Sequence, residues 1–233
     1  MKSNQSGFTL IEIAIVLVII GLLLGGVLKG QELINSARVK NLATDFKNIP
    51  VYIYGYQDKF KSLPGDDAQC CGATGHLGTA ATLATTPTSS GGVACTTTCA
   101  GNGVIDGLWK PAAATDETAL FWQHVRLANL APGSTTVSIA TGNTYIPINA
   151  VGGAIGITSA AGGPITGMRG SYIVCSDAIA GKFARQLDTT LDDGVTNTGS
   201  LQVIAAGATA VGGTAVALTT ANDDTPYLVC MGF

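Results

Sequence analysis

The residues best suited to covalent chemistry in this chain are six cysteines: Cys70, Cys71, Cys95, Cys99, Cys175 and Cys230. All six follow a long apolar segment near the amino terminus, which favours a membrane and an oxidising compartment where disulfides form. The four at positions 70, 71, 95 and 99 flank a segment rich in Thr, Gly and Ser, a poor core former that disulfides would tie down. Structural zinc is the alternative for these four sulfurs, but adjacent cysteines and an extracytoplasmic setting argue against it. The sequence leaves the pairing of these four open.

A second kind of chemistry, calcium binding by oxygen ligands, is conceivable in the segment Gly101–Gly107. Its spacing matches the middle of a calcium loop if Asn102 and Asp106 act as ligands. Trp109 then stands where such a loop needs a bidentate carboxylate. We therefore predict an ordinary turn at this position.

Asp188, Asp192 and Asp193, directly before Gly194, form a second acidic cluster. Hard oxygen ligands on a tight loop would suit calcium, which makes these residues a weak calcium candidate. Asp residues that end a helix are also common turn formers without any ligand. No metal is favoured here, and the chain is expected to need no other cofactor.

Enzymatic and nucleic-acid-binding functions find little support. The two histidines, His76 and His124, belong to no catalytic or zinc-binding motif, and no nucleophile elbow or phosphate-binding glycine loop is present. A net charge of −3 gives no electrostatic basis for strong binding to DNA or RNA. We expect a protein that is not an enzyme, and nucleic acid is an unlikely partner.

The element that dominates the chain is the apolar segment Phe8–Leu28, which as a helix would extend about 31 Å and match the hydrocarbon core of a bilayer. It is longer than the apolar part of a cleavable signal peptide, and no small-residue cleavage site follows it. Glu12 stands near its start, where a charge in lipid is costly. One explanation is a capping box with Thr9, in which the carboxylate stabilises the first turn of the helix.

The helical pattern continues beyond the apolar segment, over residues 29–60. Apolar residues recur there at helical spacing, and lysines lie off this stripe. Pro50 interrupts the pattern and should kink the helix, and the segment Ser62–Gly65 should end it. The stripe consists of Leu42, Phe46, Ile49, Ile53, Tyr56 and Phe60.

For the remaining residues, 61–233, the sequence predicts one globular domain of helices and strands. Helices are expected at Thr115–Leu130, capped by Thr115 or Asp116, and at Asp177–Leu191. Strands are expected at Thr135–Ala140, Thr144–Ile157, Gly170–Cys175, Leu201–Ala206, Ala215–Thr219 and Tyr227–Met231. The fold class is therefore α+β, with a long amino-terminal helix packed on a mainly antiparallel sheet.

The sequence Gly7-Phe-Thr-Leu-Ile-Glu12, followed by an uncharged run to Leu28, resembles the start of type IV prepilins and of the related type II secretion pseudopilins. The resemblance implies that prepilin peptidase cuts after Gly7 on the cytoplasmic side and removes the leader 1–7. It also implies that the new amino terminus, Phe8, is N-methylated. Glu12 would then pair with the positive amine of a neighbouring subunit and set the register between subunits.

The same resemblance implies a structural subunit that waits in the inner membrane as a single-pass precursor. An assembly platform would polymerise copies of the chain into an extracellular or periplasmic filament with helix 8–28 at its core. Pilin heads often carry a disulfide near the carboxyl end, which favours Cys175–Cys230, and some pseudopilins bind calcium in this region. The alternative is a secretion pseudopilin, or a minor pilin that binds DNA or a surface.

Overall fold

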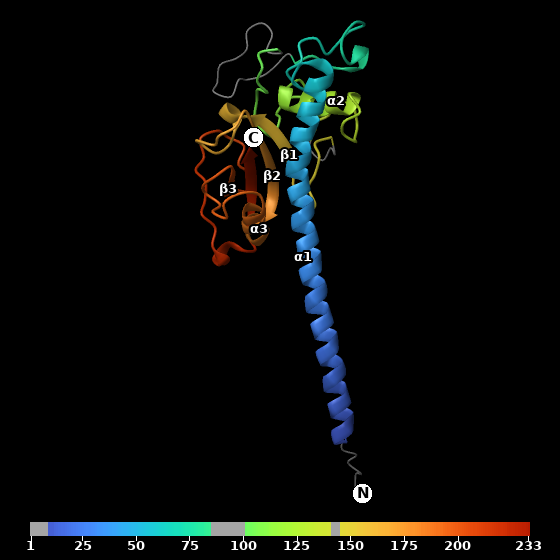
Figure 1. The fold of residues 1–233 in the computed structure, drawn as a ribbon, viewed down its shortest axis with the longest axis vertical. Coiled ribbons are helices and arrows are strands. Elements are labelled where there is room, and N and C mark those ends of the chain that lie inside the picture. Colours follow the sequence, from blue (N-terminus) through green and yellow to red (C-terminus); the bar gives the residue numbers. More distant parts are fainter. Residues whose placement is uncertain (1–8, 85–100, 141–144) are drawn as a thin grey trace. The chain divides into compact units, whose positions relative to one another are not determined.

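The computed structural model describes residues 9–84, 101–140 and 145–233 of the chain. Its first element is the helix α1, Leu10–Phe60 (Figure 1). The helix continues through Pro50, although proline supplies no N–H to the helical hydrogen bonds. It ends where Lys61 adopts a positive φ of 57° and donates its N–H to the carbonyl of Gln57. The predicted single long helix is thus confirmed, with a start two residues later than Phe8.

The second part of α1 belongs to a compact unit formed by residues 41–233, which we call the head. Within the head, five of the six residues of the predicted apolar stripe are buried, and Phe60 at its end is half-buried. Lys47 and Lys59 are exposed, as their place off the stripe predicts. Burial of this stripe against the rest of the head explains why the helix persists here.

The described residues of the head form one sheet of four antiparallel strands in the order β1-β2-β4-β3. The last strand in sequence therefore lies inside the sheet, between β2 and β3. The bounds of the strands are Ile155–Ser159 for β1, Tyr172–Ala180 for β2, Leu201–Ala205 for β3 and Pro226–Gly232 for β4. This architecture confirms the predicted α+β class with an antiparallel sheet.

The favoured disulfide, Cys175–Cys230, joins the two central strands. The two cysteines are directly opposite each other in the register of β2 and β4. They lie in a buried apolar cluster on the sheet that also contains the fully buried Trp109, whose indole N–H donates to the carbonyl of Ala208 at 2.7 Å. The bond therefore links residues 55 positions apart in the centre of the head.

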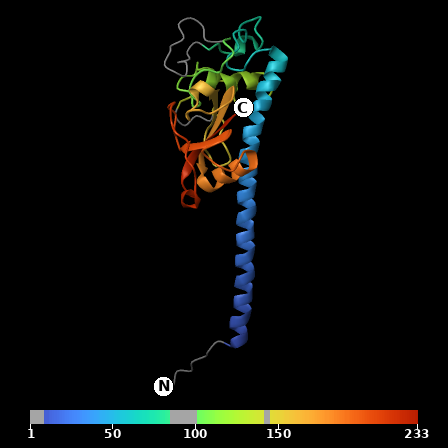
Figure 2. The same ribbon diagram turned by 60° about the vertical axis from the view of Figure 1, so that its left-hand side comes forward.

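Two further α-helices complete the described head: α2, Glu117–Leu127, and α3, Gly181–Leu191. The two views place α2 near one end of the sheet and α3 near the other (Figures 1 and 2). Asp116 is the residue before α2, but its carboxylate accepts hydrogen bonds from the N–H groups of Ala112 and Ala113. The predicted helix 177–191 is correct only from residue 181, because β2 continues through a bulge as far as Ala180.

Two predicted strands are wrong, and long-range hydrogen bonds explain both. Residues 135–140 form no strand; on either side of them, the carbonyls of Ser134 and Tyr145 accept from the guanidinium of the buried Arg126. Residues 215–219 form no strand either. Their backbone groups bond to the hydroxyl of Thr196 and, through the N–H of Val216, to the carbonyl of Val203.

The other strand predictions differ mainly in their bounds. Of the described residues 145–157 of the predicted strand 144–157, only those from Ile155 onward belong to a strand, β1, which continues to Ser159. Ile148 and Ala154 form an isolated antiparallel bridge before it, with a turn between them. The predictions for β3 and β4 are confirmed to within one residue at each end, and β2 begins two residues later than predicted.

Candidate functional site

The first turn of α1 carries the charged group that the sequence singles out, the carboxylate of Glu12. Its Oε2 accepts hydrogen bonds from the backbone N–H of Thr9 at 2.8 Å and from the Thr9 hydroxyl at 2.7 Å. In return, the N–H of Glu12 donates to Oγ1 of Thr9 at 3.3 Å. These contacts are those of a capping box. Among the described residues, Oε1 of Glu12 has no partner.

The apolar surface that follows Glu12 is completely exposed in the single chain. Every residue from Thr9 to Lys29 is exposed, including the large side chains of Leu, Ile and Val along the whole segment. In the part of the chain that the structure describes, α1 is the one helix that is long and apolar enough to cross a membrane. An unbroken apolar surface of this size requires lipid or another apolar surface as its surroundings. Gly7 and Phe8, the predicted cleavage and methylation positions, lie outside the described residues.

The head contains a polar centre where the segment after α1 meets the glycine-rich turn at 101–103. The carboxylate of Asp66 accepts three hydrogen bonds from the backbone N–H groups of Gly101, Asn102 and Gly103. The side chain of Asn102 donates to Asp106 at 2.7 Å. The N–H groups of this turn therefore point toward an anion supplied by the chain itself, as expected for a turn held by a carboxylate.

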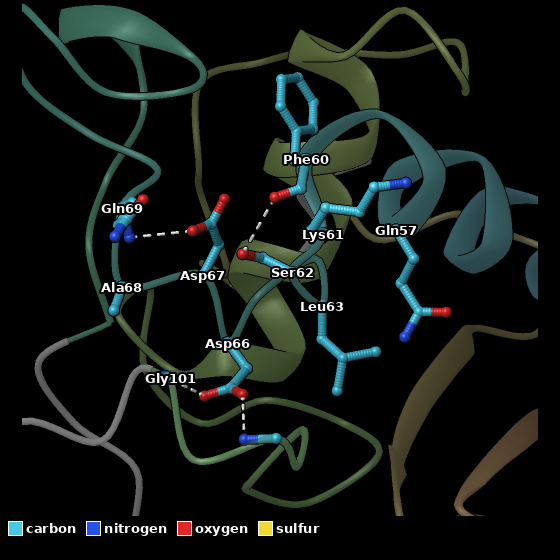
Figure 3. A pocket seen from close by; sticks show the side chains of 11 residues that line it. Gln57, Phe60, Lys61, Ser62, Leu63, Asp66, Asp67, Ala68, Gln69 and Gly101 are labelled. Atoms are coloured by element: carbon cyan, nitrogen blue, oxygen red, sulfur yellow. Dashed lines mark hydrogen bonds between the residues drawn. The ribbon is translucent and has the colours of Figure 1, made fainter.

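A cavity of about 540 Å³ opens beside this centre, and Figure 3 shows the side chains that line it. Two of them, Asp66 and Asp67, are carboxylates, and both are already engaged by donors of the chain. Oδ2 of Asp67 accepts from the Tyr56 hydroxyl at 2.8 Å and lies 2.8 Å from Nδ1 of His76, while Oδ1 accepts from the N–H of Gln69 at 2.9 Å. Burial raises the pKa of Asp67, but these hydrogen bonds outweigh burial and hold the pKa below its ordinary value. Asp67 thus fastens this segment to Tyr56 of α1, and Asp66 fastens it to the turn at 101–103.

Glu117, the first residue of α2, is an acid that sequence reasoning missed. It is fully buried, its Oε2 accepts from the N–H of Asp106 at 2.6 Å, and its Oε1 has no partner among the described residues. Burial, and after it the charges of Asp66, Asp106 and Asp116, raise the pKa of Glu117 to about 8, although the N–H of Asp106 opposes the shift. The carboxyl is therefore protonated at neutral pH in the folded head.

This shift predicts that Glu117 makes the head less stable as the pH rises from about 4.5 to about 8. Over that range the folded state holds a proton that the unfolded state has released, so the free energy of unfolding falls by up to about 1.4 kcal/mol per pH unit. Glu117→Gln removes this contribution while keeping the shape of the side chain. We expect the variant to be more stable than the wild type near pH 8 in thermal unfolding of the full chain in detergent.

The matched control for this prediction is Asp58→Asn, which neutralises a side chain that is 92% exposed. The free energy of unfolding of Asp58→Asn should change with pH as that of the wild type does. If the wild-type and Glu117→Gln stabilities stay parallel across this range, the buried carboxyl does not titrate as described.

His124 lies close to the neighbouring cysteines Cys70 and Cys71. Their sulfur and ring nitrogen atoms already have partners within the chain. Cys70 and Cys71 are bonded to each other in a disulfide between neighbours, a pairing the sequence left open. Nδ1 of His124 accepts from the N–H of Gly65 at 3.0 Å, and Nε2 lies 3.1 Å from the carbonyl of Thr82, to which it donates. Burial lowers the pKa of His124, which keeps the ring neutral. Cys70, Cys71 and His124 therefore contribute to the packing of the segment that follows α1. Cys95 and Cys99 lie outside the described residues.

Gly65 shows why this packing requires glycine. Its φ is +90°, and a Cβ at this position would lie 2.5 Å from the carbonyl oxygen of Glu117. The backbone of residue 65 therefore approaches α2 closely enough to donate to His124.

The predicted acidic cluster at the end of α3 is brought together in the structure. One carboxylate oxygen from each of Asp188, Asp192 and Asp193 lies within 4.8 Å of the others. Asp188 is fully buried, Asp192 half-buried and Asp193 exposed. Among the described residues, Asp106 belongs to no such group of His, Cys, Asp or Glu side chains, and its Oδ2 accepts from the side-chain amide of Asn102.

Comparison with known protein families gives one match. Residues 2–28 match the model of the prokaryotic N-terminal methylation motif, the prepilin-type cleavage and methylation segment. Curated proteins and solved structures gave no match to the chain. The motif includes the predicted leader and the exposed apolar part of α1, and it indicates a precursor of the type IV pilin or pseudopilin type. It suggests a structural subunit, and together with the apolar helix it fits a precursor anchored in the inner membrane.

Proposed function

We propose that this chain is a structural subunit of a type IV pilus-like filament. In this proposal prepilin peptidase removes residues 1–7 after Gly7, and the amine of Phe8 is N-methylated. An inner-membrane assembly platform then moves the subunit from the membrane into a filament made of copies of the same chain. The observation that carries the proposal is that the methylation motif includes the apolar start of α1, whose residues 10–28 are all exposed in the single chain.

The energetics of the apolar helix support assembly through this surface. Burial of a large apolar side chain gains roughly 1.5–3 kcal/mol relative to water, and the segment 10–28 carries such side chains at most positions. In the membrane this gain is largely offset, since lipid is already an apolar environment. Transfer to a filament therefore needs external work, and a polar contact must select the register among many apolar ones.

Glu12 supplies that polar contact in the proposal. The bonds from Thr9 use Oε2, so Oε1 remains for a second donor. The positive amine of Phe8 in a neighbouring subunit is the donor that cleavage after Gly7 would create. An ion pair in the apolar core of a filament is much stronger than one in water, and an unpaired charge there is disfavoured.

The amino-terminal mass of the mature protein tests the first step. We expect the purified filament subunit to begin at Phe8 and to be heavier than the unmodified peptide by one methyl group, as measured by mass spectrometry of the terminal peptide. Cells without prepilin peptidase should retain Met1–Gly7 and provide the control. A mature terminus near Gly30 would instead indicate a secreted protein that loses the apolar helix.

The abundance of the subunit in sheared surface filaments tests the second step. A major structural subunit should dominate this fraction, whereas a minor pilin should be scarce in it. A pseudopilin should be absent from the cell surface under the same conditions.

A further inference from the structure

A smaller cavity, of about 110 Å³, lies in the head between α1, α2 and the start of β1. One side of it is polar and comes from a single face of α1, where Asp45, Asn48 and Tyr52 follow one another at helical spacing. An apolar cavity with a few polar groups on one side is the usual form of a small-ligand site. Since a cavity of about 150 Å³ holds benzene, this one accommodates roughly four or five non-hydrogen atoms. The apolar side consists of Ile49, Trp122, Pro132, Pro147 and Ile155.

The carboxylate of Asp45 lacks a partner in this cavity. It is half-buried, and no hydrogen bond or ion pair reaches it from the described residues. Burial raises the pKa of Asp45 above its ordinary value, and no donor or cation opposes the shift. A carboxylate that has lost part of its hydration and gained no protein donor favours a ligand that donates hydrogen bonds and carries positive charge.

The cations of the chain near this cavity do not take that role. The guanidinium of Arg126 lies over the Trp122 ring, 5.8 Å from its centroid. Its N–H groups donate to three backbone carbonyls, those of Pro132, Ser134 and Tyr145. The indole N–H of Trp122 is buried, so the cavity meets the ring and not this donor. The cavity therefore presents a carboxylate to solvent without a neutralising group.

We propose that this cavity binds the ammonium end of a linear alkylamine. The ammonium N–H groups donate to Asp45, and the side-chain oxygens of Asn48 and Tyr52 are further acceptors on the same face of α1. The carbon chain packs against the apolar side of the cavity, as the stem of a lysine does on apolar surfaces.

The composition of the walls selects this class of ligand. Aromatic rings, here those of Tyr52 and Trp122, attract organic cations. A single carboxylate provides too few oxygen ligands for a divalent metal ion. The small volume favours a slender chain over a bulky quaternary ammonium group.

Titration of the full-length protein in a non-ionic detergent with n-butylammonium chloride tests this site. The chain has two tryptophans, Trp122 in the cavity wall and Trp109 in the buried cluster on the sheet. We expect the indole N–H NMR signal of Trp122 to shift and saturate, while that of Trp109 stays unchanged. The dissociation constant should be on the order of 1 mM, as expected for a ligand of about five non-hydrogen atoms.

Matched ligands separate the contributions of charge and chain. 1-Butanol keeps the chain and lacks the charge, whereas methylammonium keeps the charge and lacks most of the chain. Each should bind at least about tenfold more weakly than n-butylammonium. Equal binding of methylammonium would reveal simple attraction of cations and overturn the proposal.

Lysine with both backbone groups blocked identifies the source of the ammonium group. Binding at least as tight as that of n-butylammonium assigns the cavity to a lysine side chain of a polypeptide. Binding at least about tenfold weaker assigns it to a free amine, because the backbone of the blocked lysine is then excluded.

Three variants make the test specific. Asp45→Asn should weaken n-butylammonium binding at least about tenfold without lowering the melting temperature, since its carboxylate has no partner to lose. Ala131→Leu adds bulk to the cavity wall and should weaken binding with Asp45 intact. Asp58→Asn neutralises a 92% exposed carboxylate on the same helix and should bind as the wild type does. The proposal is wrong if n-butylammonium causes no saturable shift of the Trp122 signal, or if Asp45→Asn retains wild-type binding.

Discussion

Replacement of Glu12 by valine is expected to leave membrane insertion and leader cleavage intact and to stop incorporation of the subunit into filaments. Valine removes the carboxylate that would pair with the amine of Phe8 on a neighbouring chain. Incorporation should fall at least about tenfold, since tenfold corresponds to only about 1.4 kcal/mol and an ion pair in an apolar core exceeds this. The measurement is the amount of mature subunit in sheared filaments relative to the amount in the membrane.

Two control variants separate the roles that Glu12 can have. Thr9→Ala removes the hydroxyl that donates to Oε2 of Glu12 and so disrupts the capping box. If Glu12 served only to cap α1, Thr9→Ala would reduce incorporation as much as Glu12→Val does. Glu32→Val removes an exposed carboxylate that pairs with Lys29, beyond the methylation motif, and should assemble normally. Normal incorporation of Glu12→Val would remove the proposed contact with the neighbouring amine.

Removal of the Cys175–Cys230 disulfide has the largest expected effect on the stability of the head. With the cysteines 55 positions apart, the chain-entropy model gives a loss of about 4 kcal/mol when both are replaced by alanine. Domains of this kind are stable by roughly 5–15 kcal/mol in total, so the loss is a large fraction. Denaturant unfolding of the full chain in detergent measures it.

The chain contains a matched control for this second prediction. Cys70 and Cys71 are neighbours in sequence, and their disulfide closes no long loop of the unfolded chain. Replacing this pair by alanine should therefore reduce the free energy of unfolding much less. Equal losses for the two double variants would show that loop closure is not how Cys175–Cys230 stabilises the head.

The parts of the fold that could be predicted are those with a strong local signal. The apolar segment has the length of a membrane-spanning helix, and the stripe after it has helical spacing over several turns. Cys175 and Cys230 each stand in a short run of β-branched and aromatic residues, and the structure places them opposite each other. For the stripe and the two cysteine strands, local pattern was enough because burial within the head reinforces the propensity of each segment.

The parts that could not be predicted depend on distant residues. The segment 135–140 has the composition of a strand, but backbone groups that flank it bond to Arg126 on α2. Glu117 looked like an ordinary acidic residue in the first turn of a helix, but it is fully buried, and its carboxyl accepts from the N–H of Asp106. No spacing in the sequence indicates either contact.

The candidate functional residues divide in the same way, into those with a local sequence signal and those that depend on distant contacts. The methylation motif is a local sequence signal, visible in Gly7–Glu12 and the uncharged run that follows to Leu28. The cluster at Asp188 was visible as a group of acids, but its most informative property, a buried carboxylate without a partner, exists only once α3 packs on the sheet.

The edges of the sheet bear on how copies of this chain can associate. At β3, the N–H of Val203 donates to the carbonyl of Thr196, and its carbonyl accepts from Val216. At β1, the N–H groups of Ile155 and Ser159 donate to the carbonyls of Pro147 and Ile105. Backbone groups at both borders that would otherwise recruit a foreign strand are thus already occupied. If the chain assembles as proposed, these occupied edges would oppose strand pairing between neighbouring heads, and association would depend on the apolar helices.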